Sequence, residues 1–313
     1  MKQLTNPYYT QKFSTIISYS TVFITLFTLF FSCDKQTRQA ESPKEKTTTE
    51  MNRNSSRQDK PAIHPQHRQK RDYRIVHVFV ALCDNTHQGI VPVPTTLGNG
   101  QDPANNLYWG ALYGVKTFFR KSTYWKPITI IKAPQQAEIL DCVCFRRGDM
   151  YLIAQAYDGA KMQTTLADFF QAAAGQSDVE IMIQKDQAAL ILHAGGLSDL
   201  VCFVGHNGLM DVRLRSLPRP NSFRKPEEAV VLACKSHAYF TPLLQKVGCE
   251  PLITTSGFMA PEAYTLEAIV RNWADTKPIA EIHLAAAKAY ANYQRDCTIA
   301  AAKRLFKAGV SME

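Results

Sequence analysis

The chain has 313 residues, of which 45% are hydrophobic, and its formal net charge is +9. That length is sufficient for one or two domains with a sizeable core. Residues 1–33 contribute +2, and residues 34–72, with ten Lys/Arg and six Asp/Glu, contribute +4. The remaining residues contribute +3 and contain no dense basic stripe, which argues against nucleic acid as a partner.

Residues 1–33 have the order of charged and apolar residues that is typical of a secretory signal. Two lysines precede the uncharged run Thr21–Cys33. The Ser32-Cys33 pair at the end of this run resembles the lipobox of bacterial lipoproteins, which implies lipidation of Cys33. The alternatives are an uncleaved helix extended back through Ser14–Ser20 and ordinary cleavage. Either of the first two tethers an exported protein to a membrane, on the periplasmic or outer face of a bacterium.

Residues 34–72 contain almost no large apolar side chains. Such a segment cannot bury enough surface to offset the entropy of ordering, so we expect a disordered polar spacer. A single globular domain is then expected over residues 73–313.

Within this domain, short β-rich apolar runs alternate with amphipathic segments. The expected strands and helices, in chain order, are strand 75–82, helix 105–119, strands 127–132, 142–146 and 151–157, helix 164–174, strands 199–205 and 229–233, helix 241–247, strand 251–256 and helices 263–274 and 278–307. Arg147-Gly148-Asp149 is expected to form a hairpin turn. The alternation predicts an α/β fold with a mostly parallel central sheet and helices on both faces.

The chain contains eight cysteines, at positions 33, 83, 142, 144, 202, 234, 249 and 297. Disulfides are allowed outside the cytosol, but their pairing is left open. Cys142 and Cys144 point to the same face of one strand. No metal site is predicted, because no second set of ligands has a zinc-like spacing. We expect most of the cysteines to be small buried hydrophobic residues.

Two consecutive buried strands end in residues that are suited to thiol chemistry. The run Asp199–Gly205 is followed by His206, and the run Ala229–Ala233 is followed by Cys234. Ligands of open α/β sheets bind at the carboxyl ends of the strands. There a histidine activates a thiol, and the thiolate attacks a carbonyl. Gly208 frees nearby backbone N–H groups to approach an oxyanion.

Several alternatives remain beside this pair. Cys83 and His87 form a rival pair on one loop, and His193, His206 and Asp211 form a weaker combination for a metal. Cys234 on its own is equally typical of core packing.

The segments DLVCFVGHNGLMD (199–211) and AVVLACKSHAYF (229–240) resemble the caspase-like cysteine peptidases, a superfamily that includes caspases, metacaspases, gingipains, separases and CHAT domains. The resemblance implies a three-layer sandwich and a peptide or protein substrate, with no cofactor. It implies His206 as the general base or acid and Cys234 as the nucleophile of a thioester mechanism.

The end of the first strand helps to line the primary specificity pocket in these peptidases. Asp84 occupies that place, which predicts a preference for Lys or Arg side chains. The alternative is that Asp84 only caps a turn. One residue departs from the family pattern, because Asn207 directly follows the histidine where Gly is usual. This departure keeps open a second interpretation, a non-catalytic surface scaffold with the same fold.

Overall fold

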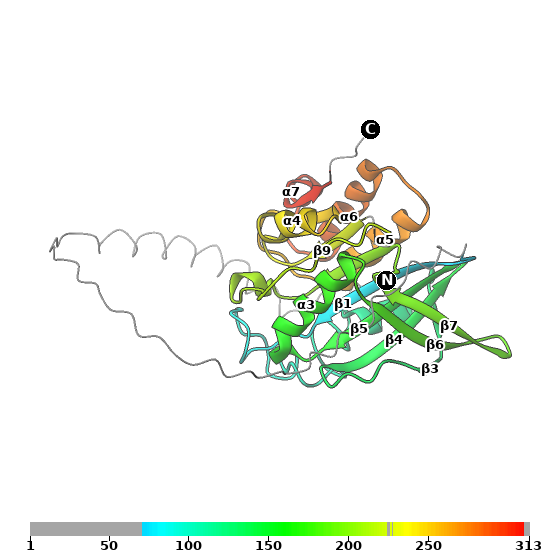
Figure 1. The fold of residues 1–313 in the computed structure, drawn as a ribbon. Coiled ribbons are helices and arrows are strands. Elements are labelled where there is room, and N and C mark those ends of the chain that lie inside the picture. The colour runs from blue at the N-terminus through cyan, green and yellow to red at the C-terminus, as the bar shows by residue number, and fades with distance from the viewer. Residues whose placement is uncertain (1–70, 224–225, 227, 310–313) are drawn as a thin grey trace, which may run out of the picture. The chain divides into compact units, whose positions relative to one another are not determined.

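The computed structural model describes residues 71–223, 226 and 228–309 (Figure 1). The predicted leader, with Cys33, and nearly all of the predicted spacer lie outside the described residues. Among the residues that are described, no helix is long and apolar enough to cross a membrane.

The domain is organised around an eight-stranded sheet, whose order is β11-β10-β9-β8-β1-β5-β4-β2. The strands are β1 (Arg74–Ala81), β2 (Lys126–Ile128), β4 (Ile139–Arg147), β5 (Met150–Tyr157), β8 (Leu200–Val204), β9 (Glu228–Leu232), β10 (Glu250–Thr255) and β11 (Phe306–Ala308). The five strands from β10 to β5 run parallel, and antiparallel pairings join β11 at one edge and β4 and β2 at the other. The α/β fold and its mostly parallel sheet are thus confirmed, within a mixed sheet.

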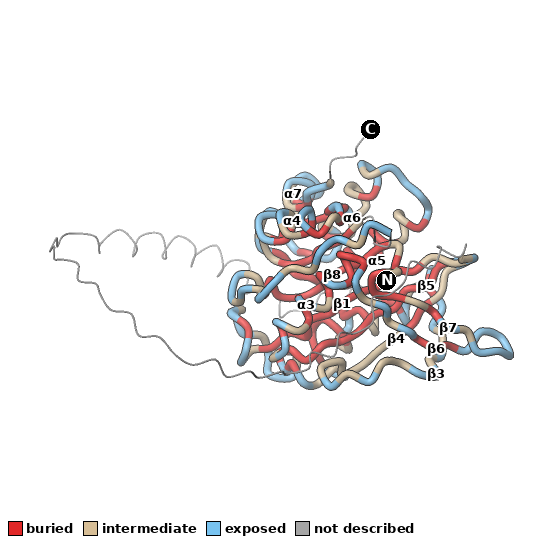
Figure 2. Tube along the Cα trace, in the orientation of Figure 1, coloured by how far each residue is buried: buried red, intermediate tan, exposed pale blue. Residues whose placement is uncertain are grey.

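Six helices accompany the sheet: α2 (Val115–Lys121), α3 (Met162–Ala173), α4 (Ser236–Lys246), α5 (Ala263–Ala274), α6 (Ile279–Tyr293) and α7 (Ile299–Leu305). Helices α3 and α4 share one hydrophobic cluster with alternate residues of β1, β8 and β9. The other residues of these strands are equally buried, so both faces of the sheet are covered (Figure 2). Helix α5 packs on α2 and α6, and Arg74 and Glu228 tie its end to the starts of β1 and β9.

Aromatic side chains join α3 and α4 to the middle of the sheet. The Phe169 ring lies edge-on to Phe79 and Phe203, with ring centroids 5.8 and 5.7 Å apart. Phe240 of α4 contacts Phe169 and also stacks on Phe170 at 5.9 Å. Such ring pairs add a specific geometry to the burial of apolar area. They therefore fix both helices over β1 and β8.

A second, three-stranded antiparallel sheet has the order β3-β6-β7 and comprises β3 (Ile130–Lys132), β6 (Asp178–Lys185) and β7 (Ala188–Gly195). The fully buried His77 connects it to the main sheet. Its Nδ1 accepts the Gly195 N–H at 3.1 Å, and its Nε2 lies 2.9 Å from the amide oxygen of Gln155. Burial lowers the pKa of His77 to about 4, although the bond to Gln155 opposes this. His77 is therefore a neutral core residue.

Several sequence-based expectations differ from the structure. The strand expected over residues 127–132 is divided between β2 and β3, and the helix expected over residues 241–247 begins at Ser236. The helix expected over residues 105–119 begins only at Val115, because the Asn106 amide bonds the backbone of Cys83 and folds the preceding residues into turns. The long C-terminal helix breaks after Tyr293 and restarts at Ile299, where the Thr298 hydroxyl caps α7. Its last residues form the edge strand β11. The β6–β7 hairpin was not predicted.

Candidate active site

His206 and Cys234 lie at the same edge of the main sheet. Strands β8 and β9 are parallel neighbours, and Val204 pairs with Leu232. Each candidate follows its paired residue by two positions, so both extend past the carboxyl ends of adjacent strands. This agrees with the strand arrangement expected from the sequence.

Asn207 joins the two loops directly. Its side-chain Nδ2 donates to the carbonyl oxygen of Cys234 at 2.6 Å, and its Oδ1 accepts the N–H of Leu209 at 3.1 Å. The residue is fully buried. A glycine at this position would supply neither bond. Asn207 therefore links the histidine loop to the cysteine loop.

Cys234 occupies a sharp turn between β9 and α4. The next residue, Lys235, has a left-handed φ of 52°, and its N–H donates to the Gly257 carbonyl at 2.7 Å. The thiol contacts the backbone of Met259 on the facing loop. Sγ lies 3.5 Å from the Met259 carbonyl oxygen and accepts the Met259 N–H at 3.4 Å. The nucleophile candidate is thus half-buried beneath the loop that follows β10.

Burial raises the pKa of the Cys234 thiol, and the Met259 N–H and the Lys235 charge only partly oppose this. A thiol with a raised pKa is protonated at neutral pH, whereas the thiolate is the nucleophile. Chemistry at Cys234 therefore requires a base that removes its proton at the moment of attack.

The His206 imidazole is buried and bonds through Nε2 to the carboxylate of Asp211. Asp211 also lies 3.5 Å from the N–H of Gly89, on the loop after β1. An ionised carboxylate only accepts, so Nε2 carries the proton and Nδ1 is the basic nitrogen. This bond, by which Asp211 orients the imidazole, was not predicted from the sequence. The available signal was an acid five residues after His206, across a turn that contains glycine.

Gly208 itself does not offer its N–H group to an oxyanion. Its N–H donates to the His206 carbonyl at 3.0 Å, so it is already occupied. A Cβ at Gly208 would lie 2.2 Å from Cγ of Met162, which explains why only glycine fits against α3. Among the described residues, the backbone N–H groups of Asn207 and Cys234 make no such bond. These two amides are the better candidates for an oxyanion.

Asp84 lies at the end of β1, as expected, but its carboxylate is enclosed. Oδ1 accepts the backbone N–H groups of Thr86 and His87 at 2.7 and 3.0 Å, and Oδ2 lies 2.9 Å from Nδ1 of His87. Burial alone would raise the pKa of Asp84, but the bonds from His87 and Thr86 lower it overall. Its side chain therefore stabilises this loop.

The rival sites are not assembled. Cys83 is fully buried, whereas the His87 ring is half-exposed and faces Asp84. The three residues considered for a metal do not meet. His206 bonds Asp211, whereas His193 bonds Asp178 on the β6–β7 hairpin. Five cysteines of the described region are free thiols, namely Cys142, Cys144, Cys202, Cys234 and Cys297.

A buried polar network holds the loop that covers Cys234. Glu262 accepts the Tyr264 hydroxyl at 2.9 Å, and the Gln294 amide lies 3.4 Å from the same carboxylate oxygen. Two residues before Glu262, the Ala260 N–H donates to the Tyr290 hydroxyl at 3.1 Å. Burial raises the pKa of Glu262 to about 7, although the bond from Tyr264 opposes this. These bonds therefore anchor the loop that follows β10.

Comparisons with family models, curated proteins and solved structures found no match to this chain.

Replacing Glu262 with glutamine should change how stability depends on pH. The pKa of Glu262 is about 7 when folded and near the ordinary 4.5 when unfolded. Ionisation thus costs the folded state stability as pH rises from 4.5 to 7, and the cost is constant above that range. Relative to the parent, Glu262→Gln should gain about 3 kcal/mol across this window.

Urea unfolding of the full chain at pH 4.5 and at pH 8 measures this difference. Glu281→Gln, at an exposed ion pair with Lys277, is the matched control and should show almost no pH-dependent gain. An equal effect of Glu262→Gln at both pH values would show that this carboxyl titrates normally.

Proposed function

We propose that this protein is a membrane-tethered cysteine peptidase of the caspase-like type, in which His206 and Cys234 form the catalytic pair. The observation that carries the proposal is the pairing of β8 with β9, which brings a histidine and a cysteine to one sheet edge. The Asn207 bond between their loops supports it, because catalytic groups must be held in a fixed relation. The three-layer caspase-like sandwich is part of the same proposal.

The proposed mechanism uses His206 as the base and Cys234 as the nucleophile. Nδ1 of His206 takes the proton from the Cys234 thiol, and the thiolate attacks the scissile carbonyl. The N–H groups of Asn207 and Cys234 bind the resulting oxyanion. His206 then protonates the leaving amine, the C–N bond breaks, and a thioester forms on Cys234. Water, deprotonated by His206, hydrolyses the thioester and restores the thiol.

A non-catalytic scaffold is the second candidate. The observation in its favour is the raised pKa of Cys234, since a protonated, half-buried thiol is also what a packing cysteine shows. The two candidates differ in one requirement. A scaffold has no chemical need for a basic nitrogen at His206, whereas the peptidase depends on it.

The first prediction concerns turnover of fluorogenic peptides that vary at the residue before the scissile bond. Cys234→Ala should abolish cleavage, and His206→Ala should lower kcat by about 10²–10⁴. Cys297→Ala is the matched control, because Cys297 is also partly exposed and should be dispensable. Cleavage by Cys234→Ala at the parent rate would show that Cys234 is not the nucleophile, whereas no cleavage by the parent protein would favour the scaffold.

The second prediction assigns Asp211 as a positioning residue. Asp211→Asn keeps the shape of the side chain but loses the charge that holds the proton on Nε2 of His206. We expect kcat to fall by at least about tenfold with KM unchanged, because the lost bond orients the base and does not bind substrate.

Asp275→Asn is the control for this loss of a carboxylate, since it removes only a surface ion pair with Arg147. If Asp211→Asn raised KM and left kcat intact, Asp211 would belong to substrate binding instead.

The third prediction concerns specificity. A preference for Lys or Arg through Asp84 requires the substrate cation to displace the His87 ring, because that ring already bonds the carboxylate. Asp84→Ala should then weaken cleavage after basic residues selectively, and His87→Ala should strengthen it. The same peptide panel measures both. Equal cleavage after basic and acidic residues by the parent would remove the Asp84 pocket and leave the catalytic pair unaffected.

The membrane tether rests on the sequence of residues 1–33 and on lipidation of Cys33. Because residues 34–72 follow this anchor, they would separate the peptidase domain from the bilayer.

A further inference from the structure

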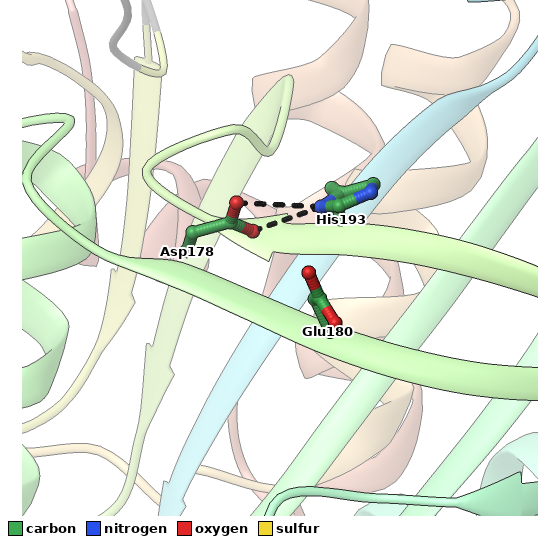
Figure 3. A group of neighbouring side chains, drawn as sticks. All are labelled: Asp178, Glu180 and His193. Atoms are coloured by element: carbon green, nitrogen blue, oxygen red, sulfur yellow. Dashed lines mark hydrogen bonds and ion pairs between the residues drawn. The ribbon is translucent and has the colours of Figure 1, made fainter. Parts of the chain in front are cut away.

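Three side chains with metal-binding atoms meet on the β6–β7 hairpin (Figure 3). Asp178, Glu180 and His193 each offer one ligand atom, and these atoms all lie within 4.8 Å of one another. We propose that these residues form a binding site for one Zn²⁺ ion. The proposal is independent of the peptidase function.

The alternation of the two strands creates this cluster. Glu180 pairs directly with His193 across the antiparallel ladder, and Asp178 precedes Glu180 by two positions on the same face. The residues that flank them on the two strands pack into the core beside β1 and β5. These residues are Val179, Ile181, Leu192 and Ala194. Because these residues point inward, the three polar side chains share the outer face of the hairpin (Figure 3).

The spacing of the ligand atoms suits a metal ion. Nδ1 of His193 lies 3.1 and 3.3 Å from the two oxygens of Asp178. Metal–ligand bonds of about 2.0–2.2 Å place neighbouring ligands about 3.0–3.5 Å apart. The Asp178–His193 pair already has this separation. A tetrahedral zinc site has this separation between every pair of ligand atoms, so the ligand atom of Glu180, which lies within 4.8 Å of the other two, must approach them by about 1.8 Å at most.

The donor set indicates the type of ion. One imidazole nitrogen with two carboxylates suits Zn²⁺, whereas Ca²⁺ and Mg²⁺ prefer oxygen ligands alone. Within the described part of the chain, neither Asp178 nor Glu180 forms an ion pair with Lys or Arg. The guanidinium of Arg71, which donates to the His193 carbonyl, is paired with Asp199. A bound cation would therefore offset the charge of two carboxylates that have no Lys or Arg partner among the described residues.

The site lies near the start of β1, away from His206 and Cys234 at the carboxyl edge. Arg71 precedes β1 and contacts His193, and Gly195 at the end of β7 bonds His77 of β1. A metal here would cross-link β6 to β7 beside the point at which the chain enters the domain. We therefore expect an effect on the stability of the hairpin.

Calorimetric titration of Zn²⁺ into the purified full-length protein, with its thiols blocked by N-ethylmaleimide, tests the site. One Zn²⁺ should bind per chain, and Kd should rise at least about tenfold in both His193→Ala and Glu180→Gln. Asp186→Asn is the matched control, because it removes a carboxylate from the turn of the same hairpin and asparagine tolerates the left-handed φ of 54° found there. This variant should bind like the parent.

Two outcomes would overturn the proposal. The first is that the thiol-blocked parent binds no Zn²⁺. The second is binding that neither His193→Ala nor Glu180→Gln weakens, which would assign the ion to other residues. Glu180 has no bond to another described side chain, so Glu180→Gln should fold normally. Equal thermal melting of the metal-free parent and this variant checks that point.

Discussion

The parallel pairing of β8 with β9 is the constraint on which the candidate site depends. Both strands are buried along their paired residues except at Glu228, so a shift of register would disrupt the packing on both faces of the sheet. The fixed register places His206 and Cys234 at the same level beyond the sheet. Helices α3 and α4 then pack across these strands, and α4 begins two residues after the thiol. Packing in the core therefore determines where His206 and Cys234 lie.

Two further devices refine this placement. The Asn207 amide bridges the histidine and cysteine loops, and the backbone of Met259 confines the thiol from the other side. Burial by these neighbours raises the pKa of Cys234, which makes the thiol dependent on a base. Asp211 orients that base through Nε2. The same packing that encloses the thiol thus makes its reaction depend on a base, which is the role proposed for His206.

The sequence predicted those elements whose signal is local. The strands before His206 and Cys234 are continuous apolar runs with turn residues after them, so both their existence and their chemistry could be inferred. The β6–β7 hairpin was not predicted. Its residues nevertheless alternate between inward-facing ones, such as Val179, and outward-facing ones, such as Glu180, as in a half-buried strand. The helix expected over residues 105–119 begins only at Val115. Asn106 bonds the backbone of Cys83, and this contact joins segments that are 23 residues apart in the sequence.

The roles of loop residues depend on tertiary contacts and could not be inferred. Gly208 was expected to free nearby N–H groups for an oxyanion, and the structure adds that its own N–H turns back to His206 and its missing side chain accommodates Met162. Asp84 was interpreted as a substrate group, but it is occupied by His87. Asp211 acquires its role only because the loop after residue 206 folds back onto the imidazole. Sequence order indicated the candidate residues, and packing determines how they are held.

The most direct measurement of the central claim is the rate at which iodoacetamide alkylates Cys234 in the native protein, followed by mass spectrometry of the modified peptide. Cys297, the other cysteine with partial exposure in a loop, is an internal reference within the same sample. A base at His206 predicts that Cys234 reacts faster than Cys297 at neutral pH, and that His206→Ala removes the difference. Equal rates in the parent, or an advantage of Cys234 that persists in His206→Ala, would contradict the assignment of a catalytic pair.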